Sequence, residues 1–182
     1  MRIVGGQFKG RVLLAPAGQA IRPTADRARQ ALFNIVAHGE SELAGAAVLD
    51  AFAGTGALGL EALSRGAAHA TFMDIDKAAL AAIQANARKL AVLGQCAILR
   101  ADVLSPPAAT RPCRFVLLDP PYRSGLAAPA LTALRAKGWL ADDAALVIEV
   151  AAGEPFASPL KDWRIADERK YGAARLVFLS RQ

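Results

Sequence analysis

The stretch Asp119-Pro120-Pro121-Tyr122 combines an acid, two prolines and an aromatic ring directly after the apolar run 115–118. Because the prolines restrict the backbone, the Asp119 carboxylate and the Pro120 carbonyl are held side by side as two acceptors. Such a pair can bind both hydrogens of an exocyclic amine and direct its nitrogen toward an electrophile. Tyr122 offers a flat face on which an extruded base can stack. The motif predicts catalytic roles for Asp119, Pro120, Pro121 and Tyr122 in group transfer to a nucleic-acid amine.

A second motif, Asp50-Ala51-Phe52-Ala53-Gly54-Thr55-Gly56, joins an apolar run to a helical pattern. Together with Gly59 it satisfies G-x-G-x-x-G, in which a ligand can approach bare backbone and the amides at a helix start. The pattern alone allows NAD as well as S-adenosylmethionine. Asp50 favours S-adenosylmethionine, because a carboxylate at the strand end can face the ammonium group of that cofactor.

Two more acids follow predicted strands. Asp74 ends the run 69–74, where a carboxylate can bind the ribose hydroxyls of either cofactor. Asp102 follows the third strand and could accept from an adenine amino group, although a turn or a helix cap explains it equally well. The two cysteines, Cys96 and Cys113, lie too far apart for a ligand pair. We therefore expect no disulfide and no metal, and a reducing compartment.

Alternating strand and helix patterns predict an α/β fold, a mostly parallel sheet with helices on both faces. The last two apolar segments have no helix between them and predict an antiparallel hairpin at the sheet edge. The expected strands are 46–50, 69–74, 96–100, 114–119 and 145–150, the helices are 57–65, 77–90 and 125–137, and the hairpin joins 163–168 to 174–180.

The N-terminal segment is basic and lies before the alternating strands and helices. Weak alternation with turns at Gly5-Gly6 and Gly10 predicts a short hairpin, from Ile3-Val4 to residues 12–14. A helix is expected at 25–37, with Thr24 as its N-cap and Arg27 and Arg29 on its outer side. The first 30 residues hold six cations against one acid, Asp26, so we expect a phosphate-contacting surface.

Length and charge agree with this organisation. A chain of 182 residues fits one domain, 1–182, made of a basic arm (1–24) and a catalytic core (25–182). The formal charge of +6 points to a polyanionic partner. No apolar leader and no long charge-free span occurs, so we expect a cytoplasmic protein without a membrane segment, by default a monomer.

The two motifs together look like a class I, S-adenosylmethionine-dependent amino methyltransferase. Four further blocks resemble a single family, the RsmD family, which methylates the N2 amine of one guanine, guanine 966, of bacterial 16S ribosomal RNA. The blocks are Arg2-Ile3-Val4-Gly5-Gly6, Lys9-Gly10-Arg11, Arg22-Pro23-Thr24-Ala25-Asp26-Arg27 with Ala31-Leu32-Phe33-Asn34-Ile35, and the run from Gly56 to Ala67.

The resemblance implies a Rossmann-like seven-stranded sheet with a C-terminal antiparallel hairpin, a short N-terminal hairpin extension, and the small ribosomal subunit as partner. It assigns the methionine part of S-adenosylmethionine to the loop of Asp50, Phe52, Ala53, Gly54, Thr55 and Gly56. It assigns the ribose to Asp74, the adenine to Asp102 and the cofactor border to Thr24, and it includes Ile75 and Val103 among the cofactor-binding residues. RNA would be held by Arg2, Lys9, Arg11, Arg22 and Arg27.

Three other readings remain open on the residues alone. An amino methyltransferase acting on adenine or cytosine would use the same Asp-Pro-Pro-Tyr motif. An NAD-dependent oxidoreductase would explain the glycines but neither Asp119 to Tyr122 nor the basic arm. A non-enzymatic RNA-binding protein would explain the arm but give Asp119 no task.

Overall fold

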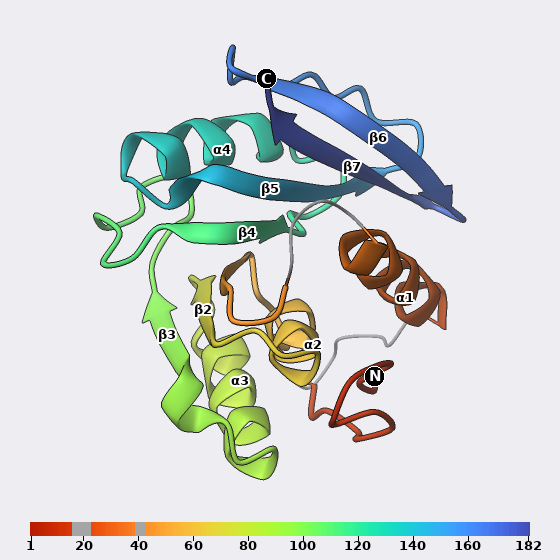
Figure 1. Cartoon of the computed structure of the whole chain (residues 1–182), viewed down its shortest axis with the longest axis vertical. Coiled ribbons are helices and arrows are strands. Elements are labelled where there is room, and N and C mark those ends of the chain that lie inside the picture. The colour runs from red at the N-terminus through yellow and green to blue at the C-terminus, as the bar shows by residue number, and fades with distance from the viewer. Residues whose placement is uncertain (16–22, 39–42) are drawn as a thin grey trace.

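The computed structural model describes residues 1–15, 23–38 and 43–182, which build around one seven-stranded sheet (Figure 1). Five strands are parallel, and the last two form an antiparallel hairpin at one edge, as the sequence predicts. Across the sheet the order is β3 (Cys96–Arg100), β2 (His69–Asp74), β1 (Ala47–Ala51), β4 (Cys113–Leu118), β5 (Leu140–Ala151), β7 (Ala174–Arg181) and β6 (Trp163–Tyr171).

Strand order reverses at β1. The chain proceeds outward from β1 to β3 and then returns to the opposite side of β1 as β4. In open α/β sheets ligands bind at such a switch point, beyond the carboxyl ends of the strands. The topology therefore predicts a ligand site at the residues that follow β1 and β4.

Helices cover both faces of the sheet. The helices α1 (Pro23–His38), α2 (Ala57–Ser64) and α3 (Lys77–Lys89) pack on one face, and a short 3-10 turn, Leu93–Gln95, follows α3. On the opposite face lies α4 (Ala127–Ala136). Neighbouring residues of β1 alternate between the two cores, with Val48 in the first and Leu49 in the second, as a strand buried on both faces requires.

The predicted bounds are mostly confirmed to within two residues, with two larger differences. Strand β6 ends at Tyr171 rather than at residue 168. Strand β5 begins at Leu140 rather than at residue 145. Its pairing with β4 is irregular there, because Cys113 pairs with Leu140 but Phe115 with Ala145. Two exposed acids, Asp142 and Asp143, occupy the irregular part, so the apolar pattern of a strand is interrupted in the sequence.

The prediction for α1 needs two corrections. The helix begins at Pro23, so Thr24 lies inside its first turn and is not the N-cap; proline is favoured at a first helical position because its missing N–H has no partner to lose. Arg29 does not face outward. It is 4% exposed and donates from Nη2 to the Arg2 carbonyl at 2.6 Å, with its Nε 3.7 Å from Glu61 Oε2.

In the described part of the N-terminal arm, residues 1–15, the chain reverses direction as predicted, but the predicted strands are longer than the pairing that forms. Only one bridge forms, between Arg2 and Val12, supported by hydrogen bonds from Ile3 N to Arg11 O and from Gly10 N to Ile3 O, both 2.9 Å. The arm uses its other polar groups to attach to α2 and α3 instead.

Two buried side chains make this attachment. Glu61 of α2, fully buried, accepts from Val4 N at 2.8 Å and pairs with Arg65 Nε at 2.8 Å. Asn86 of α3, also fully buried, accepts from Leu14 N at 2.7 Å and donates back to the Leu14 carbonyl at 3.0 Å. The arm is therefore held by internal polar contacts.

Close backbone packing reinforces the same attachment. Ser64 Oγ donates to the Gly5 carbonyl at 2.6 Å and accepts from Phe8 N at 2.9 Å. A side chain at Gly6 would place its Cβ 1.9 Å from the Ser64 carbonyl oxygen, at a positive φ of 71°. Glycine is required there for both reasons.

We expect Glu61→Ala to destabilise the protein by about 3–5 kcal/mol, because the buried Arg29 and the half-buried Arg65 would lose their carboxylate. Urea unfolding measures the change. The matched control is Glu168→Ala. This change on the surface of β6 removes an ion-pair partner of Arg175 and should lower the free energy of unfolding by less than about 1 kcal/mol. Equal losses in the two variants would contradict the anchoring role of Glu61.

Candidate functional site

The glycine turn between β1 and α2 has an unusual backbone. Phe52, Gly54 and Gly56 all have positive φ, at 60°, 52° and 76°. A non-glycine residue rarely adopts this conformation, and such strain gathers at binding sites. A Cβ added at Gly54 would find its nearest atom 4.0 Å away, whereas one at Gly59 would lie 2.4 Å from Phe72 Cε1. Gly54 therefore leaves room above the turn, and Gly59 allows α2 to pack closely on β2.

Two predicted site residues, Asp50 and Asp74, hold this turn in place. Asp50 Oδ2 accepts from Gly59 N at 2.8 Å and so serves the N-terminus of α2, where Gly56 provides no side-chain cap. Asp74 Oδ2 accepts from Gly54 N at 2.8 Å, and its Oδ1 from Asp76 N at 2.9 Å. A carboxylate oxygen has two lone pairs, so Asp74 can still accept from a ligand hydroxyl.

Electrostatics at Asp50 are dominated by burial. The side chain is 1% exposed, and desolvation raises its pKa well above the ordinary value of 3.8, while the hydrogen bond from Gly59 opposes the rise. The negative charges of Asp119 and Asp74 raise the pKa further. The charges of three predicted site residues, one at each of three strand ends, thus interact at one edge of the sheet.

Asp119 to Tyr122 lies beside the glycine turn. Strand β4 pairs with β1 up to Ala51 and Leu118, and Asp119 N donates to the Ala51 carbonyl at 3.4 Å. Asp119 and Pro121 are exposed, Pro120 is buried and Tyr122 is half-buried. The two motifs, separated by more than 60 residues of sequence, therefore meet at the switch point of the sheet.

Glu149 was not singled out from the sequence. Tyr122 Oη donates to its Oε1 at 2.5 Å, which fixes one end of the ring. Since Leu118 pairs with Ile148, Glu149 on β5 follows in the same register as Asp119. This register could have pointed to Glu149 from the sequence, because Asp119 and Glu149 each come directly after an apolar run.

A second acid, Glu154, holds the chain that follows Tyr122. Its Oε2 accepts from Arg123 N at 2.8 Å, and Arg123 adopts a positive φ of 58°. Beside it lies a hollow of about 340 Å³, lined by Tyr122, Arg123, Ala151, Ala152, Gly153 and Ala173. Tyr122, the last residue of the Asp-Pro-Pro-Tyr motif, thus borders this hollow.

The remaining cofactor candidates occupy different environments. Ile75 follows Asp74 and is 64% exposed, which is unusual for a large apolar side chain. Asp102 is exposed, and its Oδ1 accepts from Leu104 N at 2.9 Å, as a turn aspartate does. Val103 is 2% exposed and packs in the second core, away from solvent. Thr55 is buried and donates to Met1 Sδ at 3.3 Å.

Four of the five predicted RNA-contacting cations are described, and all four are exposed. Arg2, Lys9 and Arg27 line one groove between the arm and α1, whereas Arg11 is not among its lining residues. Arg22 and the side chain of Thr24 lie outside the described residues.

Comparison with known proteins agrees with these motifs. The family model "Conserved hypothetical protein 95" matches residues 1–180. The chain belongs to this family. The "Ribosomal RNA small subunit methyltransferase D" of Escherichia coli strain K12 is 38% identical over 173 residues, covering 94% of this chain and 85% of that protein. Its counterpart of the same name in Haemophilus influenzae is 32% identical over 182 residues, covering 94% and 89%.

Solved structures support the same assignment. The Escherichia coli protein yhhF superposes with a TM-score of 0.83 at 34% identity, covering 100% of this chain and 98% of that one. The fold of this family member is that of the class I S-adenosylmethionine-dependent methyltransferases, and the resemblance to the RsmD family is confirmed. Among the described residues, no helix has the length and apolar character needed to cross a membrane.

Asp50→Asn tests the cause of the raised pKa. Because the folded protein binds this proton more tightly than the unfolded chain, the proton-linked stability is fully present below about pH 3.8 and is lost as the pH rises through the folded pKa. Asparagine keeps an oxygen for Gly59 N but does not titrate. We expect the free energy of unfolding of the variant, relative to wild type, to increase as pH rises above 3.8. Urea unfolding over a pH series measures it, and a difference independent of pH would contradict the assignment.

Proposed function

We propose that this protein is a cytoplasmic enzyme that transfers the methyl group of S-adenosylmethionine to the N2 amine of a guanine in small-subunit ribosomal RNA. The observation that carries the proposal is the meeting of the glycine turn with Asp119 to Tyr122 at the ends of β1 and β4. One element suits a nucleotide-like cofactor and the other a planar amine. The names of the Escherichia coli and Haemophilus influenzae relatives support RNA of the small subunit as the substrate.

The residues around the turn fit S-adenosylmethionine. The space above Gly54 admits a ligand against the backbone, and Asp74 has lone pairs left for ribose hydroxyls. The exposed side chain of Ile75 would cover one face of the adenine. When bound, the cofactor supplies a methyl group activated by its sulfonium centre. The negative charges of Asp74 and Asp119 favour a cationic ligand over a pyrophosphate.

The chain's own part in the reaction is to orient the amine. The Asp119 carboxylate and the Pro120 carbonyl would accept the two amine hydrogens, which favours a pyramidal nitrogen with its lone pair directed outward. Tyr122 would stack on the base, and its bond to Glu149 keeps the ring from rotating out of place. Positioning of this kind contributes much of the rate when the electrophile is already reactive.

The experiment that tests the proposal is methyl transfer from radiolabelled S-adenosylmethionine to small ribosomal subunits that lack their native methylations. Nucleoside mapping follows. We expect label in N2-methylguanosine at a single 16S site. Label in N6-methyladenine or in a methylated cytosine would keep the mechanism and overturn the base assignment. Binding of NADH without binding of S-adenosylmethionine, measured by calorimetry, would overturn the cofactor as well.

Asp119→Ala should lower kcat at least about a hundredfold, since one transition-state contact is removed, while the Kd for S-adenosylmethionine stays near that of wild type. Single-turnover methylation and calorimetry measure the two quantities. The matched control is Asp143→Ala, which removes an exposed aspartate at the far end of β5, paired with Arg114. Its kcat should not change. A comparable loss in both variants would remove Asp119 from the reaction.

Glu149 is expected to act as a positioning residue through Tyr122. Glu149→Ala should lower kcat about tenfold with little change in cofactor Kd, because the ring loses its fixed orientation. Glu149→Gln keeps an acceptor for Tyr122 Oη and should recover most of the activity. If Tyr122→Phe, which lacks the hydroxyl, is as active as wild type, the hydrogen bond has no positioning role.

A further inference from the structure

The backbone of the glycine turn is bonded to a buried side chain that lies outside the turn. Asn86 on α3 is fully buried, and its Nδ2 donates to the Thr55 carbonyl at 3.2 Å. Thr55 stands between Gly54 and Gly56 in the turn and is itself 7% exposed. Because its partner lies in the interior, the Thr55 carbonyl points into the protein, away from the space above Gly54.

The same amide group binds the N-terminal arm. Asn86 Oδ1 accepts from Leu14 N at 2.7 Å, and Nδ2 donates to the Leu14 carbonyl at 3.0 Å. An amide has two N–H donors, and Asn86 uses one for the arm and one for the turn. Turned over, it would place its oxygen against two carbonyls and its N–H groups against the Leu14 N–H. The three contacts together therefore fix the orientation of the amide.

Helix α3 packs directly behind the turn. A Cβ added at Gly56 would lie 2.9 Å from Cγ1 of Ile83, and Ile83 is fully buried. Ile83 comes three residues before Asn86, so the two side chains share one side of the helix. The turn thus contacts α3 through an apolar side chain at Gly56 and a polar one at Thr55.

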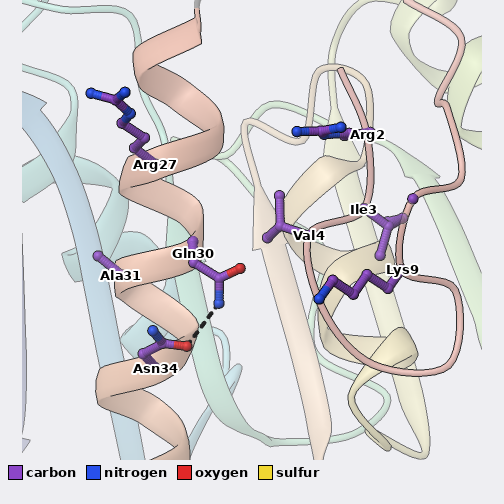
Figure 2. A pocket seen from close by; sticks show the side chains of 9 residues that line it. Arg2, Ile3, Val4, Lys9, Arg27, Gln30, Ala31 and Asn34 are labelled. Atoms are coloured by element: carbon purple, nitrogen blue, oxygen red, sulfur yellow. Dashed lines mark hydrogen bonds between the residues drawn. The ribbon is translucent and has the colours of Figure 1, made fainter.

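The side chain of Thr55 makes a second contact with the arm. Its Oγ1 donates to Met1 Sδ at 3.3 Å, and the Met1 carbonyl accepts from Leu13 N at 3.0 Å. Figure 2 shows the arm beside α1, where a groove of about 490 Å³ lies between them. Neither Thr55 nor Asn86 lines that groove, so the arm meets the turn at a different place.

The conformation of the turn at Thr55 needs such a support. Gly54 and Gly56 have φ values of 52° and 76°, and glycine adopts other φ values at little cost, so the peptide groups around Thr55 can turn readily. Without the N–H of Asn86, the Thr55 carbonyl would be buried without a partner, which is unfavourable. The turn would then relax until this carbonyl reached water, on the side where a ligand binds.

We propose that Asn86 is a positioning residue for S-adenosylmethionine. It holds the Thr55 carbonyl inward and so keeps the turn in the conformation that binds the cofactor. An inward carbonyl leaves the ligand side of the turn to N–H groups at the start of α2, which suit the carboxylate of the methionine part. Asn86 acts through Thr55 and does not touch the cofactor. The inference rests on the proposed function for the choice of ligand.

Calorimetric titration with S-adenosylmethionine tests this role. We expect Asn86→Ala to raise the Kd about tenfold, because a buried hydrogen bond that holds the turn is lost. The single-turnover rate at saturating cofactor should stay near that of wild type, because Asp119 and Tyr122 are untouched. The effect of the variant thus appears in cofactor binding and not in the chemical step.

The matched control is Lys89→Ala on the same helix. Lys89 Nζ donates to the Val12 carbonyl at 2.7 Å, so the change removes a contact between α3 and the arm that does not involve the turn. Its Kd for the cofactor should equal that of wild type. An equal rise in both variants would assign the effect to attachment of the arm and overturn the proposal. An unchanged Kd in Asn86→Ala would overturn it as well.

Hydrogen exchange in the wild type tests the same role even if Asn86→Ala does not fold. Because coupling is reciprocal, a cofactor that favours the held turn also favours the other bonds of Asn86. We expect saturating S-adenosylmethionine to slow exchange of the Leu14 amide about tenfold. The amide of Gly10, which binds the Ile3 carbonyl within the arm, should exchange as before. A Leu14 amide that exchanges equally fast with and without cofactor would contradict the role of Asn86.

Methyl transfer to small ribosomal subunits separates a failure of this inference from a failure of the proposed function. If the wild type methylates one guanine and Asn86→Ala binds the cofactor as well as wild type, only the role of Asn86 is overturned. If binding of S-adenosylmethionine depends on Asn86 but no ribosomal guanine is methylated, the role of Asn86 is supported and the proposed function is overturned. A wild type that binds no S-adenosylmethionine would overturn both.

Discussion

The turn after β1 depends on two carboxylates that bind backbone amides. Asp50 accepts from Gly59 at the start of α2, and Asp74 accepts from Gly54 across the neighbouring strand. Both bonds tie the end of a strand to the turn or to the helix that follows it, next to Phe52, whose positive φ of 60° is a strained conformation for a non-glycine residue. Since Asp50 is buried, the free energy of its desolvation is partly offset by the hydrogen bond from Gly59. The space above Gly54 exists because these bonds keep the turn open.

The same short helix, α2, carries the contacts of the basic arm. Gly59 in its first turn is bound to Asp50, and Glu61, two residues later, accepts from Val4 of the arm. Ser64, the last residue of the helix, holds Gly5 and Phe8. An eight-residue helix therefore fixes the cofactor turn at one end and the arm at the other. A displacement of the arm would be transmitted to the turn through less than 12 Å of helix, at about 1.5 Å per residue.

Local patterns in the sequence predicted the sheet and the two motifs, because each depends on neighbouring residues. Strands β2 and β3 agree with the prediction at every residue, and the hairpin β6–β7 lies at the edge where the missing helix placed it. Arg29 and Glu149 were misjudged or overlooked because their roles depend on distant partners. The charge of Arg29 suggested exposure, yet Glu61 of another helix makes its burial favourable. Glu149 gains its role only through the register of β4 on β5.

The charge of this molecule is unevenly distributed, with acids and cations in separate regions that suit different ligands. The carboxyl edge of the sheet gathers acids, and the repulsion of Asp119 and Asp74 on Asp50 shows that their charges act on one another there. The net charge of +6 is nevertheless positive, and the arm is one of its sources. A sulfonium and ammonium cofactor is attracted to the first region and repelled by the second, while an RNA backbone experiences the opposite. Under the proposed function, this separation keeps phosphates away from the acidic edge, so that only an extruded, uncharged base can approach Asp119.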